Sequence, residues 1–391
     1  MKILVRPLFI SFVLGSVATG AWPQAQRRAA LGSVAAAEST FAARVARLSE
    51  QAGYFDSDNL ISNESSYLHP VSALRGLNVT GGAFIGVGPD QSFSYIAAIR
   101  PRVAYIIDIR RDNLLQHLMF KALFARSRNR LEFLCRWLGY DVPRDVARWS
   151  GRPIEEIVAK LDSMAPNEGP VLTERAAVLA LVRSFDVPLD ERDLATVQRF
   201  HAEFQRERLD LRFTSHGRPP RAGYPTLRDL ILEKDLTGRP ASYLASEGDW
   251  QFVKTMQQNH LVIPVVGDLA GPHALRAIGR DVAALGTQVS ALYVSNVEQY
   301  LWRDGTFEQF ADNAIALPRN ARSVLIRSYF GRNFGSPHPL ARDGGASLST
   351  QLMQKLGDFS DRRRQGGWGS YWDLVTLGAI DLMAASAARP R

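Results

Sequence analysis

Apolar residues between positions 83 and 109 fall into two short and nearly continuous runs. The runs cover residues 83–87 and 103–109, and they are separated by a turn over 88–91 and a segment with helical spacing over 92–99. Continuous apolar runs are typical of strands that are buried on both faces of a parallel sheet. The pattern therefore predicts a strand, a glycine-containing turn, a helix and a second strand, which together form a βαβ unit.

Later parts of the chain change from a helical pattern to a mixture of strand and helix patterns. Apolar positions recur at helical spacing through residues 112–260, and Pro and Gly clusters separate the segments. Strand-like runs then return, with helical stretches between them. Three further strands are predicted over 261–268, 289–296 and 323–330, and helices are predicted over 273–285, 307–316 and 349–356.

These patterns predict an α/β protein with a Rossmann-like, mostly parallel sheet. Residues 38–111 are predicted to form the first part of the core, with its glycine-rich turn. Residues 112–260 are predicted to be a large helical insertion between the second and third strands. Residues 261–391 then complete the core and form the C-terminal tail.

Residues 1–25 have the pattern of a signal peptide or an N-terminal anchor. Lys2 and Arg6 precede an apolar stretch over residues 8–17, and small residues follow at 19–21. If this leader is cleaved, the protein is periplasmic or secreted, and a cytoplasmic location is the alternative. No later segment has the uninterrupted apolar length of a spanning helix, so no transmembrane span is expected in the mature chain.

The composition is typical of a folded protein and excludes several kinds of functional site. Apolar residues make up 46% and charged residues 22% of the chain, which excludes a mostly disordered sequence. Cys135 is the single cysteine, so an intrachain disulfide and a cysteine-built metal site are excluded, and the histidines lack metal-ligand spacing. The net charge of +8 comes without a recognised binding motif, so it gives no strong indication of nucleic-acid binding.

The turn after the first predicted strand is the main indication of a ligand. Gly86 and Gly88 lie at the carboxyl end of that strand, where the N-terminus of a helix presents free N–H groups. Asp108 ends the second strand, at the spacing of the acid that holds ribose hydroxyls in dinucleotide folds. Gln91 stands where that motif has its third glycine. The structural alternative is two glycines in a tight turn and an Asp that caps the next helix.

The third and fourth predicted strands also end in polar residues. Asp268 follows the third strand and could accept a hydrogen bond from an adenine-like base, although an Asp at such a place is often a turn residue. Asn296 and Glu298 follow the fourth strand, where Asn296 is a candidate substrate contact and Glu298 a candidate general base. The alternative is a helix N-terminus, with Asn296 as its cap and Glu298 favoured by the helix dipole.

A polar pair lies inside an apolar-ended segment before the first strand. Asn63 and Glu64 stand in the middle of residues 60–68, which cannot bury their centre without polar partners. If the segment folds over a ligand, Asn63 and Glu64 are substrate-side contacts. A hydrogen-bond network that fixes a loop is the alternative.

Taken in order, the motifs at the strand ends resemble those of class I S-adenosylmethionine-dependent methyltransferases. The resemblance rests on residues 84–88, 105–108, 265–268 and 291–296. It implies a Rossmann-like sheet with a final antiparallel hairpin. It also implies S-adenosylmethionine as the cofactor, with Gly86 and Gly88 against its methionine part, Asp108 on its ribose and Asp268 at its adenine.

Three longer segments are similar to an uncharacterised bacterial protein family. These segments are residues 61–68, 86–96 and 295–301. The resemblance covers most of the mature chain and implies no established activity.

The sequence leaves three functions open. The first is a methyltransferase-like enzyme with an unknown acceptor. The second is a nicotinamide-dependent oxidoreductase, which the glycine turn and Asp108 also permit. The third is an exported, non-enzymatic module on a degenerate Rossmann-like fold. Both enzyme hypotheses expect a small-molecule ligand, and the sequence does not set the oligomeric state.

Overall fold

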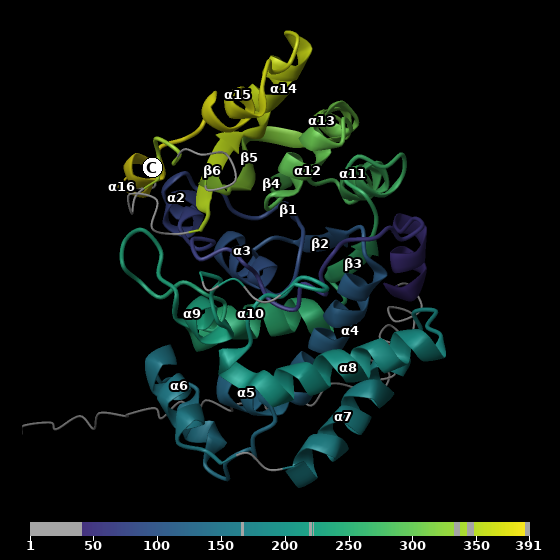
Figure 1. The fold of residues 1–391 in the computed structure, drawn as a ribbon, viewed down its shortest axis with the longest axis vertical. Helices are drawn as coiled ribbons and strands as arrows, with labels where there is room; N and C mark the ends of the chain where they lie inside the picture. Colours follow the sequence, from purple (N-terminus) through teal and green to yellow (C-terminus); the bar gives the residue numbers. More distant parts are fainter. Residues whose placement is uncertain are drawn as a thin grey trace, which may run out of the picture.

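Six strands form one mixed sheet (Figure 1). The computed structural model describes residues 41–165, 168–218, 221, 223–331, 337–341 and 348–387. The strands are β1 (Ala83–Gly86), β2 (Val103–Asp108), β3 (Val262–Val266), β4 (Val289–Tyr293), β5 (Arg319–Tyr329) and β6 (Thr350–Lys355). Their order is β3-β2-β1-β4-β5-β6; β1 to β5 pair in parallel, and β6 runs antiparallel to β5.

The predicted α/β class and the mostly parallel sheet are confirmed. Every residue of β1 to β4 is buried except Asp108, which is half-buried at the end of β2. Burial of both faces explains why these strands are continuous apolar runs rather than alternating ones.

The helix predicted over residues 349–356 is wrong. Residues Thr350–Lys355 form β6 instead, and helix α14 begins only at Leu356. Gln351 and Gln354 are three positions apart, as they would be on the polar face of a helix. In the structure both are buried, because each finds a hydrogen-bonding partner on another element. Partners on other elements therefore allow this polar segment to be a buried strand at the edge of the sheet.

The elements between β2 and β3 are almost all helical. Helix α4 contacts β2 and β3 as well as α7 and α8, and Figure 1 shows α5 to α8 beyond α4, away from the sheet. The elements are α4 (Arg111–Arg126), α5 (Arg130–Leu138), η1 (Val146–Trp149), α6 (Ile154–Asp162), α7 (Glu168–Arg183), α8 (Glu191–Glu207), η2 (Arg208–Asp210), α9 (Leu227–Leu232) and α10 (Glu247–Gln258).

Aromatic side chains join these helices to the helix that follows β1. Phe93 of α3 packs edge-on against Phe120 and Phe124 of α4 and against Tyr243, with ring centroids 5.4–5.6 Å apart. Edge-to-face contacts of this kind add to the stabilisation from burial. The same cluster continues through Phe133, Trp137 and Trp250.

The remaining helices cover the rest of the sheet and the C-terminal region. They are a helix over residues 41–48, α2 (Pro70–Gly76), α3 (Gln91–Ile99), α11 (Ala274–Ala284), α12 (Val297–Arg303), α13 (Phe307–Ile315), α14 (Leu356–Arg364), α15 (Tyr371–Thr376) and α16 (Leu382–Ala387). None of the helices in the described ranges is both long and apolar enough to cross a bilayer. The leader predicted over residues 1–25 lies outside the described residues.

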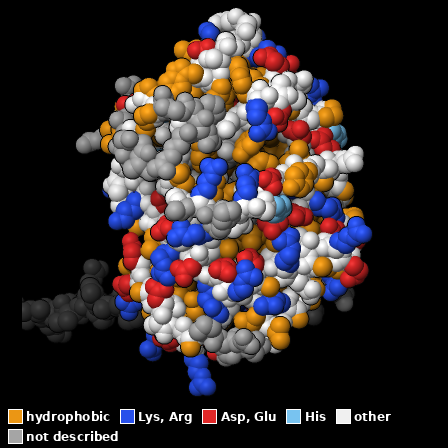
Figure 2. Space-filling view, in the orientation of Figure 1, with side chains coloured by type: hydrophobic (Ala, Val, Ile, Leu, Met, Phe, Trp, Pro, Cys, Tyr) orange, Lys and Arg blue, Asp and Glu red, His pale blue; other side chains and the backbone are white. Residues whose placement is uncertain are grey.

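Charged side chains of both signs are mixed on the surface. On the face shown in Figure 2, Lys and Arg are interspersed with Asp and Glu rather than gathered into one basic area. Ion pairs such as Arg111–Asp193 and Arg228–Asp162, at 2.6 and 2.7 Å, contribute to this mixing.

Candidate functional site

The carboxyl ends of four parallel strands bring the sequence-predicted positions to one edge of the sheet. Gly86 ends β1 and Asp108 ends β2, while residues 267–268 and 295–296 follow β3 and β4. The N–H of Gly267 donates to the carbonyl of Asp108 at 2.8 Å, so the ends of β2 and β3 are adjacent. We call these strand ends, with the turns and helix N-termini that follow them, the carboxyl edge. Open parallel sheets bind their ligands at such an edge.

Gly88 holds the turn between β1 and α3. Its φ is +81°, a backbone conformation that favours glycine. The side-chain amide of Gln91 folds over it, with Nε2 2.8 Å from the place that a Cβ on Gly88 would take. From α4, Nε2 of His117 lies 2.9 Å from the Gly88 carbonyl oxygen. Side chains of α3 and α4 therefore cover this turn.

We expect Gly88→Ala to destabilise the protein more than Gly238→Ala. The two glycines have φ values of +81° and +80°, so each substitution carries a left-handed strain of about 1–2 kcal/mol. Only at Gly88 does the new Cβ meet a neighbour, the Gln91 amide, whereas the space around Gly238 is open. Urea unfolding should give a larger loss for Gly88→Ala than for Gly238→Ala, because the buried Gln91 amide has to shift. Equal losses would show that Gln91 does not pack against this turn.

Asp108 is held by an arginine two residues later. Nε and Nη2 of Arg110 donate to its two carboxylate oxygens at 3.1 and 2.8 Å. The same guanidinium donates through Nη1 to the carbonyls of Ser57 and Asp58. The residue predicted to hold a ribose is therefore half of an ion pair that ties residues 57–58 to the end of β2.

A carboxylate that sequence reasoning missed lies at the end of β3. Glu50 accepts hydrogen bonds from the backbone N–H groups of Asp268, His273 and Ala274 at 2.8, 3.1 and 3.2 Å. The Asp268 carboxylate itself accepts from the N–H of Ala270 at 2.9 Å, as a turn residue does. Glu50 thus satisfies the free N–H groups where α11 begins. It lies over 200 residues from its partners, so no local pattern could indicate this role.

Glu64 is buried at the centre of a polar network beside β4. Its carboxylate accepts hydrogen bonds from the hydroxyls of Tyr293 and Ser295 and from Nε2 of Gln351. Three donors therefore reach its two oxygens. Gln351 also donates to Ser328 at 2.7 Å, while its Oε1 has no partner in the part of the chain that the structure describes.

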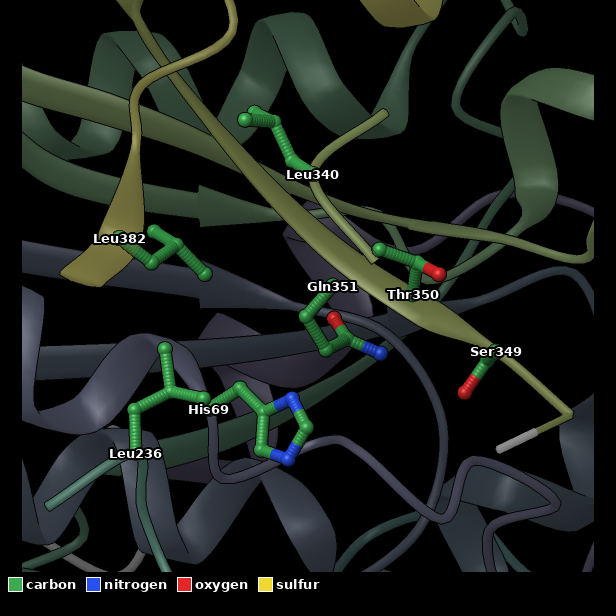
Figure 3. Close-up of a pocket in the computed structure, with 7 residues that line it drawn as sticks. All are labelled: His69, Leu236, Leu340, Ser349, Thr350, Gln351 and Leu382. Carbon is green, nitrogen blue, oxygen red and sulfur yellow. The ribbon is translucent and has the colours of Figure 1, made fainter. Parts of the chain in front are cut away.

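A pocket lies on the other side of Gln351. Figure 3 shows the Gln351 amide and the His69 ring in this pocket, with leucine side chains around them. Its free space is about 10 Å³, which is room for about one water molecule. Its other lining residues are Leu236, Leu340, Ser349, Thr350 and Leu382.

The other residues predicted from the sequence do not all lie in the hydrogen-bond network around Glu64. Asn63 is half-buried next to Glu64, and Asn296 begins α12 without a capping hydrogen bond from its side chain. Glu298 is buried and holds Arg327 through contacts of 2.6 and 3.3 Å. Burial raises the pKa of Glu298, and Arg327 offsets part of that rise.

Unpartnered polar atoms gather on the first two turns of α4. Among the described residues, both side-chain polar atoms of Asn113, Oε1 of Gln116 and Nδ1 of His117 are buried without a hydrogen-bonding partner. Burial lowers the pKa of His117 to about 4, so the neutral ring donates from Nε2 to Gly88 and keeps Nδ1 as an acceptor. These residues stand at i, i+3 and i+4 among buried apolar positions of α4, a pattern from which the sequence could have indicated them.

Cys135 is a buried, free cysteine. Burial raises the pKa of the Cys135 thiol to about 12, which keeps it protonated. Within the described ranges, no group of three or more His, Cys, Asp or Glu side chains is arranged to hold a metal ion.

Comparison with known proteins gives one family. A family model described as a domain of unknown function, DUF7790, matches residues 59–145 and 194–367. The matched ranges include Glu64, the Gly88 turn, Asp108 and Gln351. No curated protein matches the chain. With more than half of its length matched, this chain belongs to the DUF7790 family.

Proposed function

We propose that the protein is a class I methyltransferase-like enzyme that binds S-adenosylmethionine at the carboxyl edge. The observation that carries the proposal is the set of unpartnered polar atoms on α4 beside the Gly88 turn, since buried polar atoms need partners. The order β3-β2-β1-β4-β5, followed by antiparallel β6, supports a Rossmann-like sheet. In the same proposal, residues 112–260 are an insertion into that sheet.

The residues around the glycine turn suit the charged amino-acid end of this ligand. The Asn113 amide can both donate and accept, and Nδ1 of neutral His117 can accept. Asp108 is oriented by Arg110, whose backbone N–H and Nε both donate to Oδ1, so Oδ2 is the oxygen with a second lone pair for a ribose hydroxyl. At the end of β3, Glu50 takes three backbone N–H groups and Oδ1 of Asp268 accepts from the Ala270 N–H, so we assign Oδ2 of Asp268 to an adenine amino group.

S-adenosylmethionine supplies an activated methyl group when bound. The protein then has to hold an acceptor in line with that group and exclude water. Glu64 is fixed by its three donors, and Asn63 and Asn296 are the proposed contacts on the substrate side. Glu298 would have to leave Arg327 in order to act as a general base.

Calorimetric titration with S-adenosylmethionine and S-adenosylhomocysteine tests the proposal on the wild type and on Asn113→Leu. Both ligands should bind the wild type, and Asn113→Leu should bind them about 10–100-fold more weakly, as expected for hydrogen bonds to charged groups. The same variant should unfold at the same or a higher urea concentration, because it removes buried polar atoms that have no partner. Asp304→Asn, at the exposed end of α12, is the control. Equal affinity of wild type and Asn113→Leu would contradict the proposal.

An exported, non-enzymatic module is the second candidate, and it is favoured by Glu50. This carboxylate already lies on the N–H groups at the end of β3, and Arg110 already pairs with Asp108. In that case neither S-adenosyl compound nor NADH gives a binding signal, and the protein recovered from cells is processed and periplasmic or secreted. Binding of NADH alone would favour the oxidoreductase.

A further inference from the structure

An open groove runs along α11 at the end of the sheet opposite to the carboxyl edge. One half lies between α11 and α13, which are in contact (Figure 1), and has about 440 Å³ of free space. The other half has about 460 Å³ and lies beside the first residues of β1, β4 and β5. Ala283 and Pro318 line both halves, so the groove is continuous. Each volume is in the range of protein ligand sites.

Two arginines on α11 line the first half of the groove. Arg276 and Arg280 are one helical turn apart, and both are exposed. Nε of Arg276 donates to Oδ1 of Asn313 at 2.5 Å. Asn313 is itself fixed, because its Nδ2 donates to the carbonyls of Leu269 and Gly271 at 2.9 and 2.8 Å. This anchor orients the Arg276 guanidinium and leaves its Nη1 and Nη2 without a partner among the described residues.

The positive charge of these arginines is not balanced within the groove. Arg280 forms no ion pair or hydrogen bond with the other described residues. Among these residues, Asp312 is the one acid that lines this half, and Arg363 already holds it, with Nε 2.9 Å from Oδ1. Two guanidinium groups one turn apart can together hold the two oxygens of a carboxylate. The first half therefore suits a negatively charged group.

The floor of the groove next to the arginines is apolar. A Cβ on Gly279 would lie only 3.2 Å from Cδ2 of Leu317, so the absence of a side chain lets α11 pack closely against the segment that leads into β5. Ala283, Ala316 and Pro318 complete this floor.

The second half of the groove has a polar lining. The side chains of Thr287 and Gln288 have no hydrogen-bonding partner in the part of the chain that the structure describes. The other polar lining residues are Thr80, Ser290 and Asn320. These side chains can donate and accept hydrogen bonds, as the amide groups of a peptide backbone require.

We propose that this groove binds the C-terminal end of an extended peptide, with the peptide carboxylate on Arg276 and Arg280. The carboxylate supplies the missing negative charge, and the apolar floor accommodates the last side chains. The backbone then runs along α11 towards Thr287 and Gln288, which pair with its amide groups. A fatty acid also carries a carboxylate, but its chain would leave the polar half of the groove without hydrogen bonds.

The length of α11 sets the length of peptide that this arrangement needs. From Arg276 to the end of the helix at Ala284 is about 12 Å at about 1.5 Å per residue. An extended chain advances about 3.3 Å per residue, so about four residues reach from the arginines to the polar half. A peptide of five residues is therefore long enough to contact both halves.

NMR titration of the whole protein with the peptide acetyl-Ala-Ala-Ala-Ala-Leu tests this proposal. The peptide with a free C-terminal carboxylate should bind the wild type, and the same peptide with a C-terminal amide should bind at least about tenfold more weakly. Arg276→Gln and Arg280→Gln should each weaken binding of the free acid about three- to fivefold, and the double variant about tenfold. Arg192→Gln, at an exposed position of α8, is the matched control and should bind as the wild type does.

The comparison of free acid and amide needs no variant, so it does not depend on how the variants fold. Free acid and amide that bind equally, or that both fail to bind, would overturn the proposal, and so would equal binding of the free acid to the wild type and the double variant. Acetate and octanoate identify the source of the carboxylate. If either binds as tightly as the free acid, a peptide is not the ligand. The groove lies away from the carboxyl edge, so these outcomes are independent of S-adenosylmethionine binding there.

Discussion

Replacement of Arg327 by Met should lower the free energy of unfolding by about 3–5 kcal/mol. The Arg327 and Glu298 side chains are only 2% and 1% exposed, and the guanidinium holds both carboxylate oxygens. Arg327 also donates to Oε1 of Gln354 at 3.0 Å and to the carbonyl of Leu374 at 3.1 Å. Met would leave Glu298 as an uncompensated buried charge and remove a donor from two further acceptors, which is why the expected loss is large.

A second substitution separates the energetic cost of the buried charge from that of the lost packing. The double variant Arg327→Met, Glu298→Met should regain most of the loss, because it removes both charges together. Urea unfolding of the wild type, both single variants and the double variant measures this as a thermodynamic cycle. Arg303→Met, in the exposed pair with Asp304, should change the midpoint little. A double variant that is no more stable than Arg327→Met would contradict this account of the pair.

Lys121→Met should stabilise the protein at and below pH 7 by about 3–5 kcal/mol. Burial lowers the pKa of Lys121 from 10.5 to about 7. Its ammonium donates to the carbonyl of Gln257 and lies 4.5 Å from the centroid of the Phe41 ring, but no acid of the described residues shifts its pKa. Met keeps the length and apolar character of the side chain and removes the cost of a buried charge.

The stabilisation by Lys121→Met should depend on pH in a defined direction. Between pH 7 and 10.5 the unfolded chain carries a proton on Lys121 that the folded chain lacks, so this residue makes wild-type stability rise with pH. Lys121→Met removes that rise. The difference in unfolding free energy between variant and wild type, measured in urea across this window, should therefore shrink towards pH 10.5. A difference that stays constant with pH would mean that Lys121 is not buried as described.

The strands that are buried on both faces of the sheet could be predicted from the sequence, whereas the polar strand β6 could not. Nearly continuous apolar runs mark β1 to β4, because a strand covered on both faces needs few polar positions. In β6 the buried positions include Gln351 and Gln354, whose partners lie on other elements. A single segment contains no information about such partners, so its local spacing indicated a helix instead.

The candidate site could likewise be predicted only where it depends on local sequence, and not where it depends on distant partners. Sequence could indicate that Gly88 and Asp108 lie at one edge, since the ends of parallel strands meet there. It could not indicate which groups meet them, because Glu64 and Gln351 are 287 positions apart in the chain. The position of Glu50 at the end of β3 could not be predicted for the same reason.

A crystal structure of the protein grown with S-adenosylhomocysteine would show whether the cofactor binds at the carboxyl edge. We expect electron density for the ligand at this edge, with its amino-acid end within hydrogen-bonding distance of Asn113 and His117 beside Gly88. Density for the ligand elsewhere, or a carboxyl edge in which Asn113 and His117 remain without a partner at saturating ligand, would contradict it.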